Sequence, residues 1–169
     1  MKILLSKIYW KIFLVIKYCP FNFCFYLRRY ICKQLFKSFG NDCFLTDSIT
    51  ISDPKNISFG NRVSVHQYSL FDSTEEIIIG NKVAIGSHCS FITSSHNFDD
   101  INIAIKDQGI KAKKISISDN VWISNGVTVL QGVEIGKNSI IGAKSLVNKD
   151  IPENVIAAGV PCKILRKRK

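Results

Sequence analysis

The sequence lacks any paired cysteine motif. Its six cysteines include no C-x-x-C pair and follow no regular spacing, so the pattern favours buried or free thiols in a reducing compartment over a disulfide framework or a zinc site. These cysteines are Cys19, Cys24, Cys32, Cys43, Cys89 and Cys162. We therefore expect no resident metal.

The sequence also lacks an apolar run long enough to span a bilayer, which needs about 20 residues. Basic residues interrupt residues 1–39 throughout, and the longest uncharged run, Tyr18 to Leu27, is ten residues long and contains Pro20. A signal peptide fits poorly because lysines break the apolar stretch and no small-residue cleavage site follows.

Residues 1–39 instead indicate two helices broken near Pro20, each apolar on one side and basic on the other. Such helices either lie on a membrane surface or pack against the rest of the protein, and the sequence alone leaves both alternatives open. We therefore divide the chain into a basic apolar helical segment, residues 1–39, and a main domain, residues 40–169.

Composition and charge restrict the class of partner. A chain of 169 residues with 46% apolar and 21% charged residues fits one globular domain with a real core. The formal net charge of +10 favours an anionic partner, such as a phosphate-bearing ligand or an acidic membrane. The basic tail at residues 166–169 has no aromatic-interleaved basic strip beside it, so we expect no nucleic acid partner.

The most informative feature that is present is a period of six. Aliphatic residues recur without a slip at Ile117, Ile123, Val129, Ile135, Ile141 and Val147, whereas a helix has a period of about 3.6 and a strand a period of about 2. Three short strands joined by corners would close one triangular coil of about 18 residues, with the aliphatic residues stacked inside. We therefore predict an all-β solenoid.

The corners of this solenoid should hold residues that accept left-handed backbone angles. We expect them at Asn61, Asn81, Asn120, Gly126, Gly132 and Asn138. The register has two breaks: two extra residues between Phe71 and Ile79, and an excursion of about twenty residues at 97–116. From Ile117 we expect seven hexads, ending at Ala158. Loops that leave a rigid scaffold often carry function.

The stretch "ISDNVWISNGVTVLQGVEIGKNSIIGAKSLVNKDIPENVIAAGVPCKILR", residues 117–166, resembles the C-terminal signature of the hexapeptide-repeat acyltransferases. The closest likeness is to the branch of maltose, galactoside and virginiamycin O-acetyltransferases, and it covers about residues 57–166. The resemblance implies a left-handed parallel β-helix, acetyl-CoA as co-substrate, and a homotrimer whose long loop reaches over an active site between two subunits.

The resemblance also implies roles for particular residues. His96, in "ITSSHNFDD", matches the general base of the family's T-x-x-H signature, and a histidine can take a proton near neutral pH. Asp72 stands where the family has an acidic residue that holds the acceptor hydroxyl, and His66 and Gln67 are further acceptor-binding candidates. The segment "SVHQYS" departs from the family's Asn-rich pattern, which leaves the acceptor open.

Coenzyme A would lie along the C-terminal coils in such an enzyme, with its phosphates near cations. By resemblance, the residues near its arm or its phosphates are Trp122, Asn125, Ala143, Asn148, Lys149, Lys163 and Arg166. A zinc enzyme of the γ carbonic anhydrase type also has hexads, but two of its histidines are five residues apart, whereas the spacings here are 22 and 8.

These observations predict a cytoplasmic, trimeric acetyltransferase that acts on a hydroxyl of a sugar or a surface-polysaccharide precursor. Peripheral contact with the inner membrane through residues 1–39 would suit an acceptor delivered at that surface. The alternatives are acetylation of an antibiotic or another small molecule, N-acetylation of a nucleotide sugar, and a non-catalytic β-helix that serves as an assembly module.

Overall fold

The computed structural model describes residues 2–19 and 21–169. Two helices come first, α1 (Lys2–Ile16) and α2 (Asn22–Leu35), as the sequence predicted. The predicted break at Pro20 lies outside the described residues, but α1 ends before it and α2 begins after it. Neither helix, nor any other in the described ranges, has the length and apolarity required to cross a membrane.

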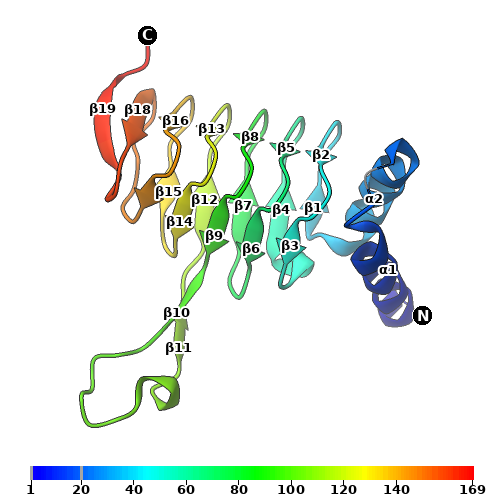
Figure 1. Ribbon diagram of the computed structural model, residues 1–169, viewed down its shortest axis with the longest axis horizontal. Coiled ribbons are helices and arrows are strands. Elements are labelled where there is room, and N and C mark those ends of the chain that lie inside the picture. Colours follow the sequence, from blue (N-terminus) through cyan, green and yellow to red (C-terminus); the bar gives the residue numbers. More distant parts are fainter. Residues whose placement is uncertain (1, 20) are drawn as a thin grey trace.

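The rest of the chain winds into a solenoid of stacked coils (Figure 1). The strands of the early coils are β1 (Ser38–Phe39), β2 (Phe44–Leu45), β3 (Thr50–Ile51), β4 (Ile57–Phe59), β5 (Ser64–Val65), β6 (Leu70–Asp72), β7 (Ile77–Ile79), β8 (Ala84–Ile85) and β9 (Ser90–Ile92). The later strands are β12 (Ile115–Ile117), β13 (Trp122–Ile123), β14 (Thr128–Leu130), β15 (Glu134–Ile135), β16 (Ile140–Ile141), β17 (Leu146–Val147), β18 (Val155–Ala158) and β19 (Lys163–Lys167).

Each full coil contributes one strand to each of three sheets, and the last, partial coil contributes β18 to one of them. Sheet A has the order β1-β4-β7-β12-β15, sheet B the order β19-β18-β16-β13-β8-β5-β2, and sheet C the order β17-β14-β9-β6-β3. All neighbours in these sheets are parallel except β18 and β19, which are antiparallel. The three sheets are the sides of a prism, and the corners between strands form its edges.

The hexad positions point into this prism, as predicted. Ile117, Ile123 and Val129 lie on sheets A, B and C respectively, and each is at most 1% exposed. Larger side chains fill the same positions in the earlier coils, where the rings of Phe71 and Phe91 stack with centroids 4.8 Å apart. That distance is the spacing of neighbouring strands, so identical positions stack coil upon coil.

The left-handed corner residue is the third residue after the inward aliphatic one. Asn120, Gly126, Gly132 and Asn138 have positive φ, as predicted. The prediction is wrong for Asn61 and Asn81, because the positive φ falls on the next residue in each case, Arg62 and Lys82. Asn61 and Asn81 instead use their side-chain oxygens, which accept the backbone N–H of Asn41 and Asn61 at 2.9 Å.

The coils shorten along the solenoid, which the predicted register captured only in part. Stacked residues are 20 apart in the early coils, 18 apart later and 16 apart at the end. The extra residues between Phe71 and Ile79 are present, but the same extension between Ile51 and Phe59, which includes η1 (Pro54–Asn56), was missed. The seven-hexad prediction is wrong after Val147, because Ile151 already pairs with Ile135.

The excursion both starts and ends earlier than predicted, since Ile115 and Ser116 already belong to β12. Strand β10 (Ser94–His96) continues past the coil and pairs antiparallel with β11 (Ile110–Ala112), and η2 (Ile105–Asp107) lies in the loop between them. The stem of this hairpin is therefore a two-stranded ribbon, and in Figure 1 the hairpin projects away from the stacked coils.

The cysteine prediction is wrong for one pair. Cys19 and Cys24 form a disulfide, because the turn between α1 and α2 brings their Cα atoms to 6.1 Å, within the usual range for such a bond. Cys32, Cys43 and Cys89 are free and buried, and burial raises the pKa of each of these thiols. Cys162 is free and partly exposed.

Candidate functional site

His96 is the last residue of β10 and lies at the stem of the hairpin, opposite Ile110 of β11. Its side chain is exposed. The hairpin is cross-linked just beyond it: the backbone N–H of Asn97 donates to the Gly109 carbonyl at 3.0 Å, and the Asn97 amide donates to the Gln108 carbonyl at 3.0 Å. The imidazole therefore faces solvent from a backbone that is held on both sides.

Both residues immediately before His96 are hydrogen-bonded to the solenoid. The Ser94 hydroxyl donates to Asp72 Oδ2 at 2.8 Å, and Gln131 Nε2 donates to Ser95 Oγ at 2.6 Å. Gln131 Oε1 is buried and has no hydrogen-bond partner among the described residues. Sequence reasoning missed Gln131, because only the folded hairpin brings it next to Ser95, 36 positions away.

Asp72 ends β6 and is half-buried at the base of the hairpin. Its second oxygen, Oδ1, accepts the Thr74 hydroxyl at 2.9 Å. Each carboxylate oxygen can accept more than one hydrogen bond, so Asp72 can hold the strand that carries His96 and still accept a bond from a ligand hydroxyl. Asp72 thus anchors Ser94, two residues before His96, and keeps capacity for a further hydrogen bond.

The remaining candidates fall on two different edges of the prism. The corners between sheets C and A, which we call edge CA, are residues 73–76, 93–114, 131–133 and 148–150. Asn148 and Lys149 lie on this edge and are exposed, and His96 and Gln131 lie on it as well. Edge CA therefore gathers the candidate base and its supports.

The corners between sheets B and C, which we call edge BC, are residues 66–69, 86–89, 124–127 and 142–145. His66, Gln67, Asn125 and Ala143 lie on this edge. Sheet C separates the two edges within one chain, so a single chain does not bring His66 or Gln67 to His96. His88, also on edge BC, stacks on Tyr68 with centroids 4.9 Å apart.

A row of outward residues on sheet B leads from Trp122 to a cation. Trp122, 52% exposed, is in register with Ile140, Ile140 with Ile156, and Ile156 with Arg166 on β19. Three strand spacings separate Trp122 from Arg166, about 14 Å. Lys163 lies on the same strand, and neither Lys163 nor Arg166 forms an ion pair within the described chain.

This row fits the chemistry of coenzyme A. Its arm is a thin chain of methylenes and amides, which an apolar strip beside a tryptophan can hold, and its phosphates bind free cations. A metal would need several ligating side chains close together, and the described ranges contain no such group of His, Cys, Asp and Glu. The row from Trp122 to Arg166, with its cations, is what suits a thioester co-substrate that carries phosphates.

Comparisons with known proteins agree with this fold and site. The family of bacterial transferase hexapeptides (six repeats) matches residues 114–149. A galactoside O-acetyltransferase of Lactococcus lactis is 40% identical over 80% of this chain and 65% of its own length. That of Escherichia coli is 32% identical over 83% of this chain and 68% of its own length. The chain thus spans just under two thirds of the Lactococcus relative.

A solved structure is also similar. It is a hexapeptide-repeat-containing acetyltransferase of Vibrio cholerae in complex with acetyl coenzyme A, which is 28% identical and superimposes with a TM-score of 0.85 over 95% of this chain and 85% of that chain. The solenoid is thus the left-handed β-helix that the sequence predicted. The chain belongs to the hexapeptide-repeat acetyltransferases.

Proposed function

We propose that the protein transfers an acetyl group from acetyl-CoA to a hydroxyl of a sugar. The observation that carries the proposal is the division of the site. An exposed histidine, whose two preceding residues are hydrogen-bonded to the solenoid, lies on edge CA, and a row from Trp122 to Arg166 lies on sheet B. A base and a cofactor strip are the two parts that acetyl transfer needs. The galactoside O-acetyltransferase relatives favour a sugar as the acceptor.

In this mechanism His96 takes the proton of the acceptor hydroxyl while its oxygen attacks the thioester carbon. The carbon–sulfur bond then breaks, and the proton leaves with coenzyme A as its thiol. Asp72 accepts a hydrogen bond from a second hydroxyl of the sugar and so fixes its orientation. No covalent bond to the protein forms at any stage.

The division between two edges also carries the proposal of a homotrimer. Cyclic trimers use interfaces in which two different surface patches meet. An interface that brings edge BC and sheet B of one subunit against edge CA of the next would assemble the base and the cofactor strip. His66 and Gln67 would then meet a sugar held by Asp72 and His96 of the neighbouring subunit.

Among sugars, we favour a unit of a surface-polysaccharide precursor presented on a lipid carrier at the inner face of the membrane. The support is the basic and apolar helical segment at the end of the solenoid, which a small soluble acceptor would not require. Alternative acceptors, such as an antibiotic or a nucleotide-sugar amine, would use the same cofactor strip.

The test is thiol release from acetyl-CoA with a panel of free sugars, lipid-linked oligosaccharides and amines. We expect turnover to depend on a hydroxyl-bearing saccharide, and the product to carry an acetyl ester that mild base removes. An amide product, which resists mild base, would replace the proposed acceptor class. Failure to bind acetyl-CoA in calorimetry would refute the enzyme itself.

A further inference from the structure

The charge of this protein is concentrated at one end of the chain. Residues 1–39 contain eight basic and no acidic residues, and the other 130 residues contain 15 basic against 13 acidic. These first residues form the layer of α1 and α2 that covers one end of the solenoid in Figure 1, at the opposite end from the C-terminus. The molecule therefore has one strongly basic end and a nearly neutral body.

One face of α1 is apolar and uncovered. Phe13 and Ile16 pack into the core, but Leu5, Ile8, Ile12 and Val15 are between 37% and 77% exposed. Their spacing of three, four and three residues places them in one stripe along the helix. Isolated exposed apolar residues are normal on protein surfaces, but a continuous stripe marks a surface that binds something.

Helix α2 extends this stripe with aromatic side chains. Phe23, Tyr26 and Tyr30 are exposed and spaced by three and four residues, so they also share one face. The ring of Tyr30 meets that of Tyr9 on α1 edge to face, with centroids 6.3 Å apart. This contact joins the two helices where their exposed faces meet, and we call the combined surface the helical apolar face.

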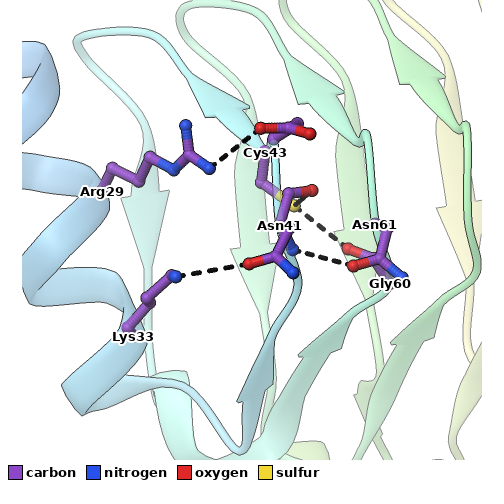
Figure 2. A network of polar contacts seen from close by, with 7 residues as sticks. Arg29, Lys33, Asn41, Cys43, Gly60 and Asn61 are labelled. Atoms are coloured by element: carbon purple, nitrogen blue, oxygen red, sulfur yellow. Dashed lines mark hydrogen bonds and ion pairs between the residues drawn. The ribbon is translucent and has the colours of Figure 1, made fainter.

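The basic residues of the two helices are used differently. On α2, Arg28 is buried and donates to the carbonyls of Ile16 and Cys19 at 3.0 and 2.7 Å. Figure 2 shows Arg29 and Lys33 reaching to the first coil, where Arg29 pairs with Asp42 at 3.1 Å. The bonds of Arg28 join α2 to the end of α1, and those of Arg29 and Lys33 fix the layer to the solenoid.

On α1, by contrast, Lys7 and Lys11 are exposed and form no ion pair with any described residue. They flank the stripe of Leu5, Ile8 and Ile12. Lys17, after the helix, lies over the ring of the exposed Tyr18 at 4.7 Å. Free ammonium groups therefore border the apolar stripe along its length.

This combination fits a bilayer better than a protein. Helices that pair with helices carry charges of both signs beside their apolar seam, which set the partner and the register. Here the flanking charges have one sign only, so a second copy of the same layer would be repelled. Lysines beside an apolar stripe, together with tyrosine and phenylalanine, are typical of helices that lie in the headgroup region of anionic membranes.

We propose that the helical apolar face docks on anionic phospholipid, with α1 parallel to the bilayer, its stripe among the upper acyl chains and Lys7 and Lys11 at the phosphates. This docking does not depend on acetyl transfer. A basic residue near such a surface contributes about 1 kcal/mol, which is about fivefold in the partition coefficient. Screening by salt should weaken it.

The test is co-sedimentation of the full-length protein with vesicles of phosphatidylcholine that contain about 30% phosphatidylglycerol, and with vesicles of phosphatidylcholine alone. We expect binding to the anionic vesicles only, and weaker binding as salt is raised. Lys7→Glu with Lys11→Glu should reduce the partition coefficient by well over tenfold. Ile8→Ser with Ile12→Ser should also reduce it, because both side chains are already exposed and their loss leaves the core intact.

The matched control is Lys82→Glu with Lys169→Glu, which makes the same change in net charge at exposed positions away from the helices. It should bind vesicles within about threefold of the wild type. Turnover with a soluble sugar checks that each variant is folded. The proposal would be overturned if the variant Lys7→Glu with Lys11→Glu bound anionic vesicles as strongly as the control. The proposal would also be overturned if the wild type did not bind vesicles but self-associated through this face. Light scattering would then give a larger mass for the wild type than for the variant Ile8→Ser with Ile12→Ser.

Discussion

At the scale of single residues, His96 carries the sharpest prediction. A positioned base contributes about 10²–10⁴ in rate, and His96 lies on a different edge from the cofactor strip. His96→Ala should therefore lower kcat by about that factor and leave the affinity for acetyl-CoA nearly unchanged. Steady-state thiol release with calorimetric cofactor binding measures both. Retention of more than about half of the wild-type kcat would show that another group is the base.

The cations on β19 should show the reverse behaviour. On the proposed function, Lys163→Ala and Arg166→Ala would each remove a phosphate contact that is equal in the ground and transition states, so the KM for acetyl-CoA should rise about tenfold while kcat is largely kept. Arg168 is the matched control, because its guanidinium already donates to the Asn138 carbonyl at 2.9 Å. Arg168→Ala should leave the KM unchanged, and a loss of kcat alone in the first two variants would contradict a binding role.

Gln131 is a positioning residue on this view, since it touches Ser95 and not the substrate. Gln131→Leu removes the bond to Ser95 together with the buried Oε1 that has no partner within the described chain. We expect kcat to fall about tenfold, because His96 loses one support, while the KM for acetyl-CoA and the melting temperature change little. A purely structural role would instead lower the melting temperature and leave kcat intact.

At the scale of the element, the corners between sheets A and B form a ladder of side-chain hydrogen bonds. Asn61 and Asn81 each accept a backbone N–H from the preceding coil, and Asp119 Oδ1 accepts that of Asn81 at 2.6 Å. Hydrogen bonds from the backbone and the side chain of Asn81 lower the pKa of Asp119. The ladder therefore ends on a carboxylate that folding keeps ionised.

This carboxylate makes stability depend on pH. Because the pKa of Asp119 is lower in the folded state, its contribution is complete above the unfolded value of about 3.9 and is lost as pH falls through the folded value. Asp119→Asn keeps an acceptor but loses the charge, so its unfolding free energy should be lower than that of the wild type at pH 7, and the difference should shrink as pH falls below about 4. Denaturant titrations of both proteins across this pH range measure the difference, and identical profiles would contradict the role of Asp119.

The same elements show what the sequence could predict. The hexads at 117–147 were sufficient to predict the solenoid, because each side of a coil needs only one inward aliphatic residue and this requirement is visible in the local sequence. The extension between Ile51 and Phe59 was missed because the early coils have phenylalanine at inward positions such as Phe59 and Phe71, where the later coils have isoleucine and valine. The short last coil depends on Asp150, whose carboxylate accepts the Glu134 N–H at 2.8 Å and closes the corner early.

Sequence could name candidate site residues only where the residue type itself indicates a chemical role, such as a histidine for proton transfer or a cation for phosphate binding. His96 and the cations on β19 could be named from motif and charge, by resemblance to the family. Their division between two edges, the link from Gln131 to Ser95 and the disulfide between Cys19 and Cys24 all depend on where coils and turns bring distant residues. None of these has a signal along the chain.

At the scale of the whole molecule, the two edges predict how subunits cooperate. Light scattering should give three times 19.0 kDa. One chain carrying His96→Ala can be co-expressed with a second chain carrying both Lys163→Ala and Arg166→Ala. Activity at low acetyl-CoA should be restored, because about one quarter of the interfaces in mixed trimers pair an intact edge CA with an intact sheet B. No rescue, or full activity from a monomer, would place the entire site within one chain.

A solenoid has a hazard that closed folds do not share, because each of its ends could template a further coil. In this protein both ends are closed. Phe25 of α2 packs on Phe44 of β2 with ring centroids 4.7 Å apart, and β19 runs antiparallel across β18. An antiparallel terminal strand presents the wrong hydrogen-bonding pattern for another parallel coil. The helical layer and β19 therefore cap the stack, which keeps the molecule a finite particle instead of the seed of a filament.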